Sequence, residues 1–190
     1  MKKIFLLMLL TGLAACSSQP PVPANRFYQL SAPNVKAVDS AQQQGLLVRR
    51  PTTSGIYNER SILYINQNKP LAIKRYHYHL WAQPPSILLR DYVVTYLRQA
   101  GAFSQVLTRR VSSAPVSELN IYIKHFEHVL NGNKAKVIVE LEMDYRHGGR
   151  HQVKTFRAEA SAGDTSLHTA AKTFARALSQ IMESMLVIMK

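Results

Sequence analysis

One segment, residues 136–145, constrains the fold more than any other part of the chain. Apolar and polar side chains alternate along it, with Val137, Val139, Leu141, Met143 and Tyr145 between Lys136, Ile138, Glu140, Glu142 and Asp144. In a strand, successive side chains point to opposite faces, so one face of this strand is apolar and the other mostly charged. Asn131-Gly132 precedes the segment and Gly148-Gly149 follows it, and both pairs favour tight hairpin turns. The pattern predicts an antiparallel three-stranded meander over residues 118–163.

Two other segments have the apolar spacing of helices. The first begins at Pro85, where a missing amide hydrogen costs nothing, and Gly101 ends it. Its apolar face would carry Leu89, Val93, Tyr96, Leu97 and Ala100. The second covers residues 166–189, with possible N-cap oxygens on Asp164, Thr165 and Ser166. Each helix has one apolar stripe that needs a sheet to cover.

Shorter strands are expected earlier in the chain, over residues 26–30, 46–50 and 61–65, with residues 71–78 pairing back as a hairpin arm. Residues 35–45 are small and polar and predict a loop. One more strand is expected between the first helix and the meander. The whole order predicts a two-layer α+β domain in which a mixed or antiparallel sheet has both helices packed on one face.

The N-terminus predicts export. Residues 1–3 are Met-Lys-Lys, and the apolar run over residues 4–10 is too short to cross a bilayer as a finished helix. Leu13-Ala14-Ala15 then precedes Cys16, the only cysteine of the 190 residues. This arrangement resembles the lipobox of bacterial lipoproteins, which implies a diacylglyceryl thioether and an N-acyl chain on Cys16. The alternative is a plain secretory peptide, but an exported lone thiol would be prone to oxidation.

The resulting plan is a signal peptide over residues 1–15, a lipidated cysteine and flexible tether over residues 16–25, and one periplasmic domain over residues 26–190. Prolines 20, 21 and 23 make the tether semi-extended, with a reach of about 25 to 30 Å. Two or three acyl chains anchor a protein stably, whereas one chain anchors it only marginally. By resemblance to Gram-negative sorting signals, Ser17 in place of aspartate implies transfer to the periplasmic face of the outer membrane.

The chain is strongly basic, with a formal net charge of +13 before processing. An exported lipoprotein does not meet nucleic acid, so nucleic acid is excluded as a partner. Phospholipid headgroups, lipopolysaccharide phosphates and acidic proteins are the available polyanions. The basic pairs Arg49-Arg50, Lys74-Arg75 and Arg109-Arg110 are spread along the chain, which is equally compatible with a surface that only maintains solubility.

Motifs for catalysis and metal binding are missing from the sequence. No serine stands in G-x-S-x-G, no glycine-rich phosphate loop occurs, and the single cysteine is assigned to lipid. His77 and His79 share one face of a predicted strand but have no ligand-spaced carboxylate beside them. His125 and His128 lie three residues apart, which places them on opposite faces. We therefore expect a non-enzyme without a metal site or a cofactor other than the lipid.

Two apolar features have a structural and a functional interpretation. Met182, Met185 and Met189 make the last helix apolar almost all round, which fits core packing or an adaptable patch facing a lipid or partner. Trp81 is either a core aromatic or an anchor that contacts a partner.

Three stretches occur in an order that resembles a known family. They are Phe27-Tyr28-Gln29-Leu30 with Pro33, then Ser61-Ile62-Leu63-Tyr64 behind Glu59-Arg60, then Tyr78-x-x-Trp81-Ala82-Gln83-Pro84 with Gly101-x-Phe103-x-x-Val106. Together, behind a lipobox, they resemble the ABC-type transport auxiliary lipoproteins, the group that includes PqiC-type outer-membrane lipoproteins.

The resemblance implies a non-catalytic lipoprotein that works with an MCE-domain protein and an ABC transporter to move lipids between the two membranes. A lipopolysaccharide-assembly lipoprotein that partners an outer-membrane β-barrel is an alternative, and an envelope hydrolase is another. The sequence leaves open the oligomeric state, a homo-oligomer included, and whether the domain itself binds phospholipid.

Overall fold

The computed structural model describes residues 21–39, 42–110 and 116–189. Cys16 and the predicted signal peptide lie outside these residues. The elements, in chain order, are β1 (Arg26–Tyr28), β2 (Gly45–Val48), β3 (Thr52–Thr53), the 3-10 helix η2 (Gly55–Asn58), β4 (Ser61–Asn66), β5 (Ile73–Trp81), α2 (Pro85–Ala100), β6 (Val106–Leu107), β7 (Val116–Asn131), β8 (Lys134–His147), β9 (Arg150–Ala162) and α3 (Leu167–Met189).

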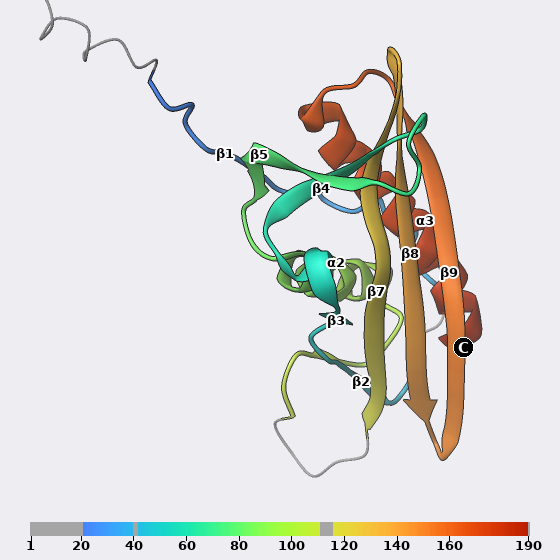
Figure 1. The fold of residues 1–190 in the computed structure, drawn as a ribbon. Helices are drawn as coiled ribbons and strands as arrows, with labels where there is room; N and C mark the ends of the chain where they lie inside the picture. Colours follow the sequence, from blue (N-terminus) through green and yellow to red (C-terminus); the bar gives the residue numbers. More distant parts are fainter. Residues whose placement is uncertain (1–20, 40–41, 111–115, 190) are drawn as a thin grey trace, which may run out of the picture.

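Strand β7 is the centre of a mixed nine-stranded sheet (Figure 1). One edge pairs with β8 in antiparallel orientation over almost the whole length of β7, and β9 continues the meander. Along the other edge, β2, β3 and β4 pair with β7 one after another, all in parallel. Strand β5 then turns back on β4, and the short β1 pairs in parallel with the end of β5.

The meander is confirmed with its turns where the sequence places them. Gly132, Gly148 and Gly149 all have positive φ, between 54° and 80°, which a residue with a Cβ adopts only at a cost. The apolar side of the alternation on β8 is buried, from Val137 to Tyr145. Because a shift of one residue would turn every apolar side chain of β8 outwards, the register is strongly specified.

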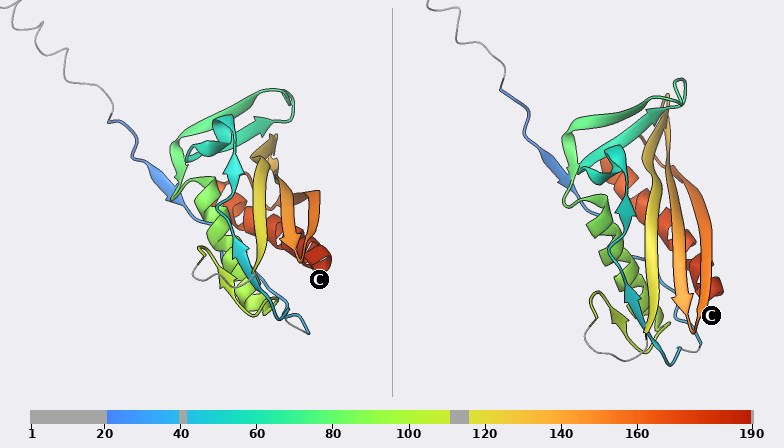
Figure 2. Two further views of the ribbon diagram at one scale, coloured as in Figure 1. Left: turned by 90° about the horizontal axis from the view of Figure 1, so that it is seen from below. Right: turned by 60° about the horizontal axis from the view of Figure 1, so that its bottom comes forward.

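Both helices cover the same face of the sheet, as predicted (Figure 2). Gly101 closes α2 in the left-handed conformation, and the Ser166 hydroxyl accepts the amide hydrogen of Thr169 at 3.2 Å at the start of α3. The aromatic centre of the core joins three elements: Phe126 of β7 stacks on Phe174 of α3 at 4.4 Å between ring centroids, and Trp81 packs against both rings. No helix among residues 21–189 that the structure places is long and apolar enough to cross a membrane.

The opposite face of the meander is charged. Arg157 of β9 bonds to Glu140 at 2.8 Å and to Glu159 at 2.9 Å, and Lys136 also bonds to Glu159, at 2.6 Å. These pairs are exposed, and exposed pairs contribute little stability each. They keep this face hydrated and leave the apolar side to the helices.

Candidate functional site

The segment Gln29–Pro33, which we call the strap, runs from β1 across the helical layer. The amide hydrogen of Ala82 bonds to the Tyr28 carbonyl at 2.7 Å just before the strap, and Val38 bonds to the Ala100 carbonyl at 2.9 Å after it. Both ends of this stretch are therefore tied to the two ends of α2. Residues 26–30 were expected to be a strand, but only Arg26–Tyr28 pair with β5, and the remainder forms the strap.

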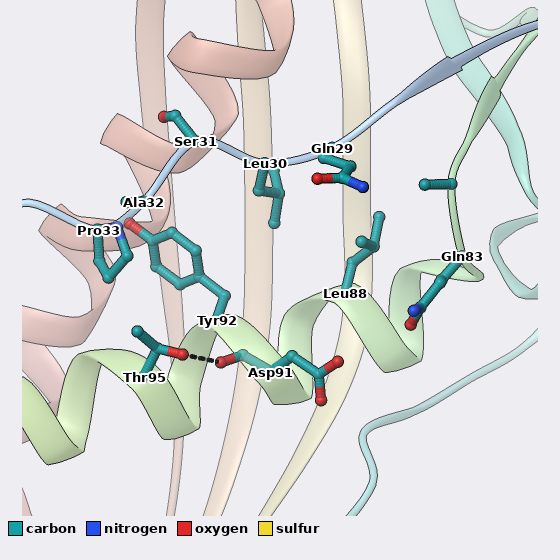
Figure 3. A pocket seen from close by; sticks show the side chains of 11 residues that line it. Gln29, Leu30, Ser31, Ala32, Pro33, Gln83, Leu88, Asp91, Tyr92 and Thr95 are labelled. Atoms are coloured by element: carbon teal, nitrogen blue, oxygen red, sulfur yellow. Dashed lines mark hydrogen bonds between the residues drawn. The ribbon is translucent and has the colours of Figure 1, made fainter.

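A groove of about 290 Å³ lies between the strap and α2 (Figure 3). In that view the side chains of Leu30 and Leu88 point into the space, and the ring of Tyr92 reaches the strap beside Pro33. The rim is polar, with Gln29, Gln83, Asp91 and Thr95. An apolar floor with a few polar groups at the rim is typical of binding clefts, and the volume is at the lower end of roughly 300–1,000 Å³ for small-ligand sites.

Tyr92 joins the two helices beneath this groove. Its hydroxyl donates to the Ala175 carbonyl of α3 at 2.6 Å, and the Ser179 hydroxyl lies 2.7 Å from the same oxygen, placed to donate to it. Burial raises the pKa of Tyr92, and the hydrogen bond with Ser179 opposes that shift. The phenol is therefore a neutral cross-link between α2 and α3.

A second groove, of about 450 Å³, lies on the other side of the strap against α3. Ser31 and Ala32 line both grooves. The α3 side contributes charged residues of both signs, among them Lys172, Arg176 and Glu183. The strap forms a two-sided surface with α2 on one side and α3 on the other, and we take it as the candidate binding site.

The side chains that line these grooves are mainly apolar and hydrogen-bonding groups. Neither lining set contains a histidine, and Asp91 lies in exposed contact with Arg90 at 3.2 Å. The arrangement offers hydrogen-bonding amides and hydroxyls around an apolar strip.

A separate polar cluster lies on the other face of the sheet, where η2 covers β7. Tyr57 of η2 donates a hydrogen bond to the buried Glu127, and His125 Nδ1 lies 2.9 Å from the same carboxylate oxygen. Burial raises the pKa of Tyr57, and the hydrogen bond to Glu127 adds to the shift. The other carboxylate oxygen of Glu127 has no hydrogen-bond partner among the residues described. Neither groove at the strap reaches this polar cluster. The cluster instead fixes η2 on β7 through the hydrogen bond between Tyr57 and Glu127.

A cluster of tyrosines and histidines occupies the helix side of β1, β4, β5 and β7. Tyr28 Oη lies 2.9 Å from His79 Nδ1, and Tyr76 Oη lies 3.2 Å from His128 Nδ1. Burial lowers the pKa of His128 to about 4 and raises that of Tyr76 to about 12. At neutral pH the imidazole of His128 and the phenol of Tyr76 are therefore both uncharged.

As the sequence predicts, His125 and His128 face opposite sides of the sheet, since His125 pairs with Glu140 on the charged side of β8 and His128 with Val137 on its buried side. Among the residues that the structure describes, no group of three or more His, Cys, Asp or Glu side chains could hold a metal ion.

The structure places the predicted partner-contact residues in the core. Trp81, Met182, Met185 and Met189 are all at most 1% exposed. A buried side chain has no surface for a partner, so the contact interpretation needs correction for all four, and core packing accounts for them. The exposed apolar residue near the end of α3 is Val187, at 72%.

Sequence reasoning missed the strap grooves. Tyr92 could have been found, because it lies three residues after Leu89 and four before Tyr96 and so extends the apolar stripe of the helix. Pro33 indicates that the strand ends here, but no local signal in Gln29–Pro33 indicates that the segment then crosses two helices.

Comparisons with known proteins agree with this architecture. The crystal structure of protein XCC0632 from Xanthomonas campestris has a TM-score of 0.70 at 24% identity, covering 85% of this chain and 92% of that one. An uncharacterised protein has a TM-score of 0.74 at 18% identity, covering 88% of this chain and all of that one. At these identities the likeness shows the fold alone. The comparison with curated proteins gives no match.

A family model described as "ABC-type transport auxiliary lipoprotein component" matches residues 28–186. The match begins at the last residue of β1 and ends three residues before the last residue of α3, so it spans the strap, both grooves and the sheet. The chain belongs to the family of ABC-type transport auxiliary lipoproteins, the family whose motifs its sequence resembles.

Proposed function

We propose that this protein is a non-catalytic, outer-membrane-anchored component of an MCE-type lipid transport system, and that it acts by binding the partner assembly. The observation that carries the proposal is the family match across residues 28–186, directly behind a lipobox cysteine. Membership of the family assigns the chain to the auxiliary components of ABC-type transport systems. The MCE-domain partner and the outer membrane are the specific parts of the proposal.

The anchor supports the location. Cys16 is followed by Ser17 and not by an aspartate, which favours transfer to the outer membrane, and the proline-containing tether leads to β1. A tether with a reach of up to about 25 to 30 Å lets the domain contact a complex that spans the periplasm. The lipid acts as an attachment and has no part in a reaction.

The grooves support a role in binding a partner over a role in carrying lipid. Their volumes, about 290 and 450 Å³, are smaller than the paired acyl chains of a phospholipid, and both are open to solvent. The strap between them presents backbone and short side chains beside exposed Gln83 and Thr95. A loop or extended segment of an MCE-domain protein fits such a surface better than a lipid molecule does.

Affinity purification of the tagged, acylated protein from solubilised envelopes tests the proposal. An MCE-domain protein and its permease should co-purify, and the Cys16→Ala variant should recover less of both. Stable recovery of a large β-barrel would instead favour lipopolysaccharide assembly. Recovery of neither, with unchanged sensitivity of a deletion strain to membrane-perturbing compounds, would contradict the proposal.

A further inference from the structure

The turn that joins β4 to β5 presents an apolar side chain to solvent in a fixed position. Leu71 is 99% exposed, and Ile73 beside it is 37% exposed. The turn is held by its own hydrogen bonds, from Lys69 N to the Asn66 carbonyl at 2.8 Å and from Ala72 N to the Lys69 carbonyl at 3.1 Å. Leu71 is thus held outside the core by an ordered backbone.

The same end of the molecule is basic. Lys69 and Lys74 flank Leu71 in the sequence, and Lys134 is the first residue of β8, directly after the β7–β8 turn. The two ends are tied together, because Gln67 N donates to the Leu130 carbonyl at 2.8 Å. No ion pair involves any of these three lysines within residues 21–39, 42–110 and 116–189. An exposed leucine among unpaired lysines is suited to a surface that is apolar beneath an anionic layer.

The position of the anchored segment is compatible with a membrane contact at the β4–β5 turn. In Figure 1 the segment that leads from the tether into β1 enters beside the last residues of β5, on the opposite side of the domain from the β4–β5 turn. Because β1 pairs with the last three residues of β5, the anchored segment and the exposed turn lie at the two ends of one strand. The nine residues of β5 span roughly 30 Å, about the reach of the tether, so a bilayer that lies along this strand can hold Cys16 and also contact Leu71.

We infer that the β4–β5 turn is a second membrane contact, in which Leu71 enters the lipid surface while Lys69, Lys74 and Lys134 bind the phosphates of anionic phospholipid. The inference rests on the proposed anchoring through Cys16. The contact fixes the orientation of the domain on the bilayer, which the flexible tether alone does not. It leaves the strap grooves free for a protein partner.

A tryptophan at the turn reports the contact directly. The acylated Leu71→Trp protein is reconstituted into vesicles of phosphatidylethanolamine and phosphatidylglycerol that carry bromine on their acyl chains. Trp81, the one native tryptophan, is buried and gives the background signal. Val153→Trp is the matched control, because Val153 is an exposed apolar residue on β9, near the other end of the sheet.

The inference predicts a blue shift of the residue 71 fluorescence and a loss of roughly half of it to bromine, as for a side chain at the boundary between headgroups and acyl chains. The residue 153 signal should not change. Charge reversal by Lys69→Glu with Lys74→Glu, or replacement of phosphatidylglycerol by phosphatidylcholine, should weaken the quenching at residue 71.

Equal, unquenched signals from residues 71 and 153 on vesicles that carry the protein would overturn the inference. Quenching that is independent of lipid charge would overturn the role of the lysines. Protein that does not float with the vesicles at all would instead contradict the proposed anchoring, so the two failures are distinguishable. If a protein partner shields residue 71 in the envelope while lipid alone does not quench it, the turn is a protein contact and the inference is wrong.

Discussion

The phenol of Tyr92 in α2 donates a hydrogen bond of 2.6 Å to the carbonyl of Ala175 in α3. This bond joins the two helices that carry the walls of the strap grooves. Because the Ser179 hydroxyl is placed to donate to the same phenol oxygen at 2.7 Å, loss of this oxygen removes a hydrogen bond from two groups of α3 and leaves the Ser179 hydroxyl without this partner.

Tyr92→Phe should therefore destabilise the domain by about 1–3 kcal/mol, the usual cost of leaving a buried polar group unpaired. The measurement is urea unfolding followed by far-UV circular dichroism. Tyr122→Phe is the matched control, because the Tyr122 hydroxyl bonds to Ser54 on the exposed surface. Equal stabilities of the two variants would contradict the cross-linking role.

Met185→Ala should destabilise the domain by about 2–5 kcal/mol, because Met185 is fully buried and the truncation leaves a cavity. Val187→Ala, two residues further on, removes an exposed side chain and should change stability by no more than about 0.5 kcal/mol. The same unfolding assay compares them. A small effect of Met185→Ala would mean that the end of α3 is not packed as described.

His128 should make stability depend on pH between about 6.5 and 4. Burial holds its pKa near 4 in the folded protein, whereas an unfolded histidine titrates near 6.5. As the pH falls through this interval the unfolded state binds a proton that the folded state does not, so stability is lost at up to about 1.4 kcal/mol per pH unit.

The slope of stability against pH in this interval should be shallower in His128→Leu than in the wild type, whatever the absolute stability of the variant. Parallel curves for the wild type and His128→Leu would show that His128 is not buried in its neutral form.

Cys16→Ala should abolish acylation and leave uncleaved or unacylated, mislocalised protein, because the thiol is the proposed attachment point. Metabolic labelling with palmitate and density-gradient fractionation of envelopes measure both effects. Ser17→Asp keeps the cysteine and should move the acylated protein to the inner membrane. Normal acylation of Cys16→Ala, or no shift for Ser17→Asp, would contradict the assigned anchor or its destination.

Elements with a local pattern were predictable from the sequence. The alternation through Val137 and Leu141, and the turns at Gly132 and Gly148, require no information from elsewhere in the chain. Helix α2 follows in the same way from its apolar stripe between Pro85 and Gly101.

Pairings between distant segments were not predictable. The parallel contacts of β2, β3 and β4 with β7 join residues more than 60 positions apart, and their strands are too short to show a period. Glu127 looks like a surface residue in the sequence, but η2 covers it because Tyr57 folds over the sheet. The candidate site depends on the same kind of distant contact, since the strap packs against α2 and α3, which lie far from it in the sequence.

The central claim is that the strap region contacts an MCE-domain protein in the envelope. A photo-crosslinking amino acid at Gln83, on the rim of the strap groove, tests it in living cells, with Thr155 on the exposed, charged face of the sheet as the control position. Irradiation should give an adduct that contains an MCE-domain protein from position 83 and not from position 155. No MCE-domain adduct from position 83, or an adduct with an outer-membrane β-barrel in its place, would contradict the claim.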